Sequence, residues 1–430
     1  MDPQENIMRP PAAETGDAAT RSVLRRYYGV WAAYSLAGGF LYGVYPIFLR
    51  TRGLSEFEIN SVLAIYFAVT FLTDIPTGAF ADALGRRRSF ALGCALRSLA
   101  FMVYFFAYHY PMFVLGETID GIGTTFCNGS IDAWGVDALD QAGYRGLKDR
   151  LFWRISQLMN LGFMLAAIAG AAVANINIAW PWLMGASGYF LCAWLIAPLM
   201  REANPRHADV ALRALPSVVK ERVVEGFRQA FRTRTFLLLT LAQGIFFAAW
   251  APYWLQWPQF FTIRYGIGIW IVGWIFALFT IARMVGAEFM IHSSIERPRR
   301  ARWLSVLAVA VAGLMYAAGS LGARTTLTLL VFCGFSICAG ALMPFAQSWI
   351  NEEIHAETRA TLLSFRSTCE TFGGSIGLLL TGVVADRAGL QASWRLAGLL
   401  SLLALPCYLT LALRARATRG SALAEAVGVR

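Results

Sequence analysis

Three carboxylates lie within one long apolar stretch of the chain, residues 111–136: Glu117, Asp120 and Asp132. A carboxylate is costly to bury in apolar surroundings, so one that is retained there generally has a function. Glu117 and Asp120 are three residues apart, which places them on one face of a helix. Two carboxylates this close in a low dielectric do not ionise together easily, and such a pair suits the uptake and release of a proton. We predict proton coupling by Glu117 and Asp120, with Asp132 and Glu370 as further candidates.

Two arginines in other apolar stretches leave the roles of these acids open. Arg97 could pair with Glu117 or Asp120 and make them structural, and the same two acids could instead line a wet vestibule. Arg283 could neutralise Glu370 or form an anion site. The sequence does not decide between these alternatives.

Aromatic side chains supply a second kind of candidate. Gln243, Phe247, Trp250, Trp254 and Trp257 recur at spacings of three and four residues, which places them on one helical face. Such a face suits an amphipathic or cationic organic substrate, through stacking and cation–π contacts. Trp254 and Trp257 could instead be anchors at the membrane interface. The other candidates for a substrate cavity are Tyr34, Tyr42, Asn128 and Arg283.

The composition of the chain is that of a membrane protein. Of its 430 residues, 57% are hydrophobic and 15% are charged, and the mean hydropathy is +0.53. A soluble protein usually has about a quarter of its residues charged. We therefore predict an integral, multi-pass protein of the lipid bilayer.

Twelve apolar stretches are long enough to span a bilayer. Each must be a helix, because a helix satisfies its own backbone in hydrocarbon. The predicted spans lie near residues 24–49, 59–81, 89–108, 111–136, 152–174, 178–199, 235–261, 267–291, 302–322, 325–350, 361–385 and 392–413. We expect a disordered cytoplasmic head (1–23), an N-terminal six-helix bundle (24–199), a cytoplasmic linker with an amphipathic helix (200–234), a C-terminal six-helix bundle (235–413) and a cytoplasmic tail (414–430).

Basic residues are distributed unequally between the predicted loops. The segments on the side of the two termini carry 27 Lys and Arg, whereas the opposite loops carry 5. Because basic loops stay in the cytoplasm, both termini are predicted to be cytoplasmic. The net charge of +11 then reflects membrane topology, and we expect no nucleic-acid partner.

The two halves of the chain resemble each other at a constant offset of 212 residues. The pattern Arg-x7-Gly-x7-Gly occurs in the predicted fifth and eleventh spans. The matching pairs are Pro46 and Pro258, Arg52 and Arg264, Arg154 and Arg366, Gly162 and Gly374, and Gly170 and Gly382. Two six-helix repeats indicate a transporter whose binding site lies between the halves.

The strongest local motif spans residues 74–88, at the inner end of the second predicted span. It resembles the signature loop of the major facilitator superfamily, Gly-x-x-x-Asp-x-x-Gly-Arg-Arg/Lys-Arg/Lys, with Ala83 where that family commonly has Arg or Lys. The residues that match are Gly78, Asp82, Gly85, Arg86, Arg87 and Arg88. Together with the spans and the repeat, the resemblance covers essentially the whole chain and implies an all-α fold of two pseudo-symmetric bundles.

The resemblance also implies roles for several charged residues. In that family the loop holds the cytoplasmic gate in one of two alternating states. Carried over, it implies one cytoplasmic latch between Asp82, or Asp74, and Arg366. The repeat places a second latch between Arg154 and Glu288. Both would form when the cavity opens outward, although static ion pairs that only fix topology are the alternative.

The resemblance implies a cavity lined by the first, fourth, seventh and tenth helices. Breaks in these helices free backbone groups for a cavity, and Pro46, Pro252, Pro258 and Pro344 fall in them. Exporters of the family often carry Gly-x8-Gly-Pro-x-x-Gly in the fifth helix. Gly162 and Gly170, with seven residues between them, come close to the spacing of its first two glycines, but Ala171 and Ala174 stand at the places of the proline and the last glycine, which weakens the case for export.

These observations together predict a secondary transporter that moves a small solute by alternating access. We expect proton-coupled export of an amphipathic or drug-like compound, with proton-coupled uptake of a small metabolite as the alternative. A sensor or scaffold of the same fold, without transport, is a third hypothesis from another class. We expect a monomer in the bacterial inner membrane. The chain has no phosphate-binding loop, nucleophile elbow or metal-ligand spacing, so we expect no enzymatic activity, cofactor or metal.

Overall fold

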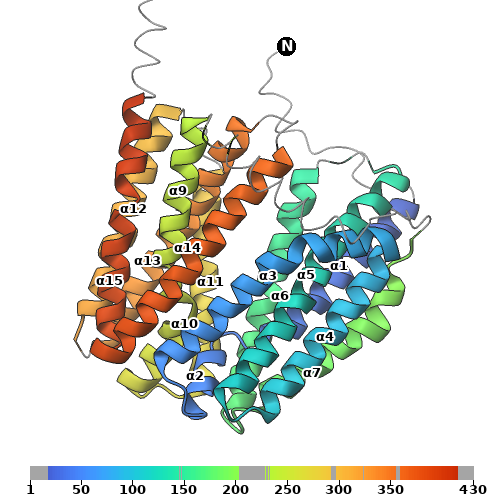
Figure 1. Ribbon diagram of the computed structural model, residues 1–430, viewed down its shortest axis with the longest axis horizontal. Helices are drawn as coiled ribbons and strands as arrows, with labels where there is room; N and C mark the ends of the chain where they lie inside the picture. The colour runs from blue at the N-terminus through green and yellow to red at the C-terminus, as the bar shows by residue number, and fades with distance from the viewer. Residues whose placement is uncertain are drawn as a thin grey trace, which may run out of the picture.

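The computed structural model describes residues 18–144, 146, 148–202, 228, 231, 233–291, 297–322, 324–354 and 359–414, and their regular structure is helical (Figure 1). The first half contains α1 (Ala18–Gly39), α2 (Tyr45–Thr51), α3 (Glu56–Leu84), α4 (Arg86–Phe106), α5 (Tyr110–Gln141), α6 (Lys148–Ala174) and α7 (Trp180–Leu191). The second half contains α9 (Arg234–Ala249), α10 (Ala251–Gln259), α11 (Ile269–Ile291), α12 (Arg297–Ser320), α13 (Thr325–Glu353), α14 (Arg359–Ala388) and α15 (Leu390–Leu402).

The proline positions correspond to breaks in two of the long helices. The chain leaves the helix after α1, and Pro46 lies in the first turn of α2. In the second half α9 ends before Trp250, and Pro252 lies in the first turn of α10. Proline suits a first turn because its missing N–H would have no partner there. Pro258 and Pro344, in contrast, lie inside α10 and α13.

The described helices form two bundles, each with its own hydrophobic core (Figure 1). The core of the first bundle is built mainly from residues 27–200, and that of the second mainly from residues 236–412. The bundles meet where α3 lies against α14 and where α6 lies against α11. Gly273 makes the second contact possible, because a Cβ there would lie 2.5 Å from the carbonyl oxygen of Ala167.

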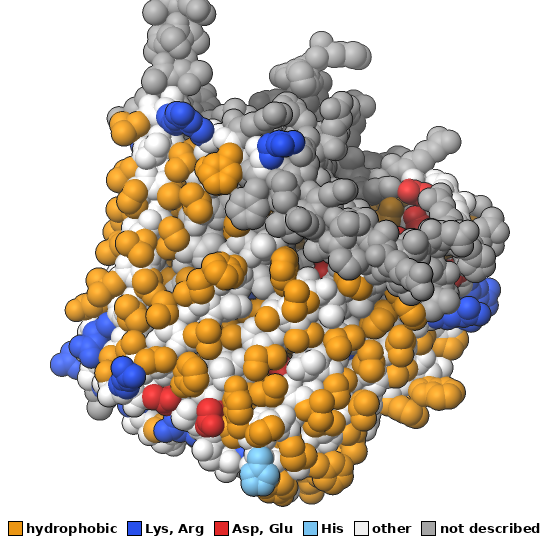
Figure 2. All heavy atoms as spheres, in the orientation of Figure 1, with side chains coloured by type: hydrophobic (Ala, Val, Ile, Leu, Met, Phe, Trp, Pro, Cys, Tyr) orange, Lys and Arg blue, Asp and Glu red, His pale blue; other side chains and the backbone are white. Residues whose placement is uncertain are grey.

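Hydrophobic side chains cover the flank of the molecule that Figure 2 shows, and charged side chains gather towards its ends. Ten helical stretches of the described residues are long and apolar enough to cross a membrane. The predicted first and fourth spans are not among them: the first is interrupted after Gly39, and α5 carries the buried acids. The structure thus describes an integral multi-pass protein, while the total of twelve spans stays a prediction.

The internal repeat is visible in the geometry of two arginines. The guanidinium of Arg52 lies 5.1 Å from the ring centroid of Phe48, and that of Arg264 lies 5.4 Å from the ring centroid of Phe260. Both partners are related by the same offset of 212 residues. The same cation–π contact therefore occurs at the same place in both halves.

The predicted head, linker and tail lie mostly outside the described residues. Residues 18–23, which we expected in a disordered head, form the first turns of α1. Helical propagation continues there because residues 18–23 contain no proline or glycine.

Candidate functional site

A cavity of 780 Å³ lies between the two bundles. Helices of the first half form most of its wall, and the second half contributes Phe247, Trp254 and Leu255. Three of its lining side chains are carboxylates, and one is an arginine. These four charged residues are Arg97, Glu117, Asp120 and Asp132.

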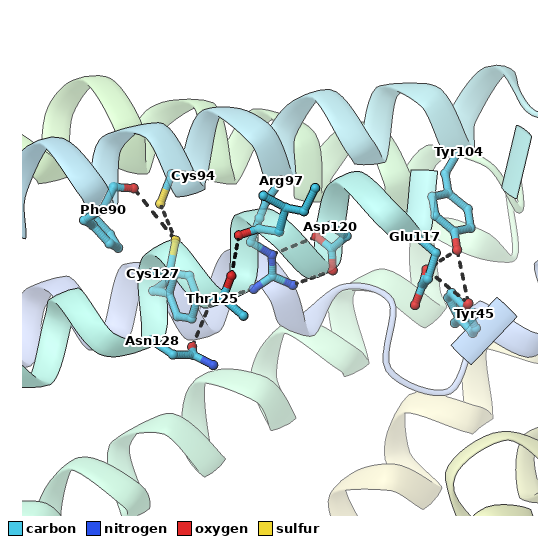
Figure 3. A network of polar contacts seen from close by, with 12 residues as sticks. Tyr45, Phe90, Cys94, Arg97, Tyr104, Glu117, Asp120, Thr125, Cys127 and Asn128 are labelled. Atoms are coloured by element: carbon cyan, nitrogen blue, oxygen red, sulfur yellow. Dashed lines mark hydrogen bonds and ion pairs between the residues drawn. The ribbon is translucent and has the colours of Figure 1, made fainter. Parts of the chain in front are cut away.

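Arg97 of α4 and Asp120 of α5 form a two-point ion pair in the cavity wall (Figure 3). The Nε–Oδ1 distance is 2.8 Å and the Nη2–Oδ2 distance is 3.1 Å. Gly123 makes room for this pair, because a Cβ there would lie 2.7 Å from Cγ of Arg97. Of the alternatives that the sequence left open, the structure therefore shows pairing of Arg97 with Asp120.

The same arginine also contacts two tyrosines. Its Nη1 donates a hydrogen bond of 2.6 Å to the hydroxyl oxygen of Tyr34, and its guanidinium lies 4.3 Å from the ring centroid of Tyr189. The hydroxyl of Tyr34 lies 3.5 Å from Oδ1 of Asn128, at the limit of a hydrogen bond. Arg97 is thus held by an anion, a hydroxyl and an aromatic face at once.

Glu117 has different partners from Asp120, although the two residues are one helical turn apart. Its Oε2 accepts hydrogen bonds from the hydroxyls of Tyr104 and, at 3.3 Å, Tyr45 (Figure 3). Trp182 fixes the ring of Tyr104 by stacking on it, with centroids 4.1 Å apart and planes 6° apart. Gly116 leaves space for that ring, since a Cβ there would lie 2.7 Å from Tyr104 Cδ2. Among the residues that the structure describes, two phenol hydroxyls contact Glu117 and no cation lies within ion-pair distance of it.

Asp132 lies about three helical turns beyond Asp120 on α5. Its Oδ1 accepts a hydrogen bond of 2.7 Å from the Tyr27 hydroxyl and one of 3.2 Å from Nε1 of Trp31. Gly135 accommodates Tyr27, because a Cβ there would lie 2.3 Å from its ring. At about 1.5 Å per residue, Asp132 lies about 18 Å from Asp120 along the helix axis. The cavity wall therefore carries two separate groups of acids.

The structure brings most of the predicted candidates of the first half to this cavity. Tyr34, Tyr42 and Asn128 line it, together with the three acids of α5. The ring of Tyr42 stacks on Phe276 of the second half, with centroids 5.0 Å apart.

Several candidates of the second half lie elsewhere. Phe247 and Trp254 line the cavity, but Gln243 and Trp250 are buried in the core of the second bundle instead. Trp257 is 3% exposed and packs on Phe279, so it is no interfacial anchor. Sequence spacing could not reveal this, because the helix breaks at Trp250 and its face changes there.

The structure also bears on one of the two alternatives that the sequence left open for Arg283, its pairing with Glu370. Nη2 of Arg283 lies 3.5 Å from Oδ1 of Asn160, whereas Glu370 lies 3.5 Å from Arg366 on the same helix. Neutralisation of Glu370 by Arg283 is therefore not observed.

The signature loop is ordered by contacts within the first half. Gly85 has a φ of 97°, which favours glycine, and Asp82 pairs with Arg86 across one turn at 2.5 Å. The backbone N–H of Arg87 donates to Oε1 of Glu202 at 2.6 Å. Arg88 follows at an exposed position of α4, and Gly78 is half-buried in α3.

The two predicted latches are Asp82, or Asp74, with Arg366, and Arg154 with Glu288. No ion pair joins Asp82 or Asp74 to Arg366, three residues that the structure describes. Arg154 and Glu288 lie at exposed positions of the adjacent helices α6 and α11.

Sequence reasoning missed the tyrosines that hold Glu117. Tyr104 and Tyr45 are distant from it in the chain, and tyrosines in apolar spans have no distinctive pattern. A usable signal was present in α5 itself, where Gly116 and Gly123 flank the two acids and mark the face on which other helices approach closely.

The architecture and the ionisable cavity define a membrane protein of the solute-transporter class. The sequence matches the Major Facilitator Superfamily over residues 30–337. Since the match covers more than half of the chain, the protein belongs to this family of membrane transporters.

Relatives and solved structures agree with this assignment. The chain is 22% identical to the uncharacterised MFS-type transporter YxaM of Bacillus subtilis, over 85% of this chain and 90% of the relative. It is 24% identical to the multidrug efflux pump Tap of Mycolicibacterium fortuitum, over 74% and 78%. The fold is similar to that of a bacterial homologue of the human lysosomal transporter Spinster in an inward-facing, unoccupied conformation. The TM-score is 0.73 at 16% identity, over 93% of this chain and 98% of that one.

Proposed function

We propose that the protein is a secondary active transporter that exports a small amphipathic organic cation in exchange for protons. The observation that carries this proposal is the cavity between the halves, in which three carboxylates face one arginine among aromatic side chains. Export is favoured by the similarity to a multidrug efflux pump.

The charges of the cavity favour a cationic substrate. Arg97 neutralises Asp120, and the partners of Glu117 and Asp132 within the described part of the chain are neutral hydrogen-bond donors. Tyr, Trp and Phe rings surround these acids, and their faces attract organic cations. A substrate that combines a positive charge with an apolar body would satisfy both features of the wall.

Proton coupling is assigned to Glu117. A buried carboxylate without a cation is stabilised when it binds a proton, whereas Asp120 gains its stabilisation from Arg97. Glu117 is 5% exposed and lines the cavity, so a bound cation would compete with the proton for it. Competition for one site is the simplest physical basis of exchange between cation and proton.

The arrangement of the two halves supports alternating access. The helices α3 and α14 lie side by side at the end where α2 and α10 lie, and they diverge towards the end where the N-terminus lies (Figure 1). With the predicted topology, this is a cavity open to the cytoplasm. The latch Asp82–Arg366 would form when the cavity opens to the other side.

Transport in proteoliposomes tests the proposal. The membrane potential is clamped with K⁺ and valinomycin, and vesicles with an acidic lumen are offered ethidium or tetraphenylphosphonium. We expect these cations to accumulate, protons to leave, and accumulation to vanish with nigericin. A neutral compound of similar ring size is the matched control and should not accumulate.

Two results would contradict the proposal. Accumulation driven only by an acidic exterior would establish uptake in place of export. Absence of transport for the whole panel, with protein that shows a cooperative thermal transition, would remove cation export altogether.

A further inference from the structure

A group of polar bonds crosses from one half of the molecule to the other where α3 meets α14 and, through Gln259, α10. We call this group the seam; it consists of Glu56, Asn60, Gln259, Thr381 and Asp386. Nδ2 of Asn60 donates to the carbonyl oxygen of Leu378 at 2.8 Å and lies 3.3 Å from Oγ1 of Thr381. Nε2 of Gln259 donates to Oε2 of Glu56 at 3.0 Å. Asn60, Gln259 and Thr381 are fully buried.

The first turn of α3 explains the part that Asp386 takes in the seam. A helix leaves four backbone N–H groups without partners at its N-terminus. Ser55 and Glu58 form a capping box, in which Ser55 Oγ accepts from the N–H of Glu58 and Glu58 Oε2 accepts from the N–H of Ser55. This local cap leaves the N–H groups of Glu56 and Phe57 without a partner in their own half.

Asp386 of α14 supplies both missing acceptors from the other half. Its Oδ1 accepts from the N–H of Glu56 at 2.7 Å, and its Oδ2 accepts from the N–H of Phe57 at 3.1 Å. A carboxylate is also favoured at this place by the positive end of the helix dipole. The N-terminus of α3 is therefore capped twice, once from its own half and once from the opposite half.

The two helices pack closely around this cap. A Cβ on Gly382, one turn before Asp386, would lie 3.0 Å from both Cβ of Asn60 and Cα of Phe57. Arg50 pairs with Glu56 and balances one of the two carboxylates that meet at this helix end. Asp386 itself lies at an exposed position, where water can replace it as an acceptor.

We propose that Asp386 is a gate residue, which keeps this end of the cavity closed by capping α3 across the two halves. This gate proposal rests on the alternating access that is part of the proposed function. When the halves separate at the seam, the carboxylate leaves the N–H groups of Glu56 and Phe57, and water takes its place. The capping box of Ser55 and Glu58 stays intact, so α3 keeps its start in both states. The cross-half cap thus adds to the stability of the closed seam without adding to that of the helix.

Hydrogen exchange of the full-length protein in nanodiscs tests the gate. In Asp386→Asn one acceptor oxygen is replaced by an NH₂ group, which cannot accept from a backbone N–H. We expect the ratio of open to closed seams to rise about tenfold, the effect of removing an N-cap. Exchange should become faster at residues 55–60 and 378–388. It should become slower at the far ends of the same helices, residues 74–82 and 362–366, because opening one end closes the other.

Ser55→Ala is the matched control, since it removes the local cap of the same helix end. We expect it to speed exchange at residues 55–59 alone. If Asp386→Asn also changes exchange only there, or nowhere, the gate proposal is overturned. Asp386→Glu, which keeps both acceptors, should behave like the parent protein. The measurement needs no substrate, so it can succeed or fail independently of cation transport.

Discussion

The two halves share one fold but differ in what they place at equivalent positions. At the offset of 212 residues, Arg97 of α4 corresponds to Val309 of α12, and Asp120 of α5 corresponds to Phe332 of α13. Val309 is exposed on the flank, whereas Phe332 is buried among aromatic rings. An apolar pair thus occupies the positions at which the first half carries an ion pair.

This difference indicates that a six-helix half can fold without a buried ion pair at these positions. Phe332 packs on Phe279 and Trp394 in the second half, with ring centroids 5.5 Å and 4.6 Å away. Replacing a buried ion pair by well-packed apolar residues is often neutral or stabilising. The charges that remain in the first half are therefore candidates for a function, and the second half contributes the aromatic residues Phe247 and Trp254 to the cavity wall.

The largest effect on stability is expected from Arg97→Met. Removing one partner of a buried ion pair leaves Asp120 uncompensated, at a cost of about 3–5 kcal/mol. Thermal unfolding in detergent should show a clearly lower Tm, and the double variant Arg97→Met/Asp120→Asn should recover most of the loss.

The matched change in the other half is Arg366→Met. Its Nε lies 3.5 Å from Glu370, compared with two shorter contacts for Arg97 and Asp120, so we expect a smaller loss. Equal losses of Tm in Arg97→Met and Arg366→Met would contradict this difference between the two halves.

A smaller effect, on affinity alone, is expected from Trp254→Leu. Trp254 lines the cavity and meets Phe67 of the first half, with ring centroids 5.3 Å apart. Loss of one cation–π contact of about 1 kcal/mol corresponds to about a fivefold weaker apparent affinity for an organic cation. Trp250→Leu is the control, because that side chain is buried in the second core. KM should rise for Trp254→Leu only; the same rise in both variants would exclude a specific role of the wall.

Much of the helical architecture could be predicted from the sequence because long apolar stretches leave few other structures. The breaks at Pro46 and Pro252 agree with the prediction that proline interrupts these helices, whereas Pro258 and Pro344 lie inside helices. The seam was not predicted, because Glu56 and Asp386 lie at helix ends, where the sequence does not distinguish them from ordinary charged residues of loops. Their roles depend on how the two halves come together, because Glu56 and Asp386 are 330 residues apart in the sequence.

For the site, the sequence identified the acids of α5 but not which of them is paired. Glu117 and Asp120 share a helix face, and only the positions of Arg97 and Tyr104 on α4 separate their surroundings. Such differences of a few ångströms are set by tertiary packing, which spacing within one helix does not contain.

The assignment of the coupled proton to Glu117 is tested most directly by measuring proton release on cation binding. The variants Glu117→Gln and Glu370→Gln are compared in proteoliposomes at equal protein density. Glutamine cannot exchange a proton, so we expect Glu117→Gln to bind the cation without proton release and Glu370→Gln to couple like the parent protein. Undiminished coupling in Glu117→Gln, or its loss in Glu370→Gln alone, would contradict the assignment of the proton to the first half.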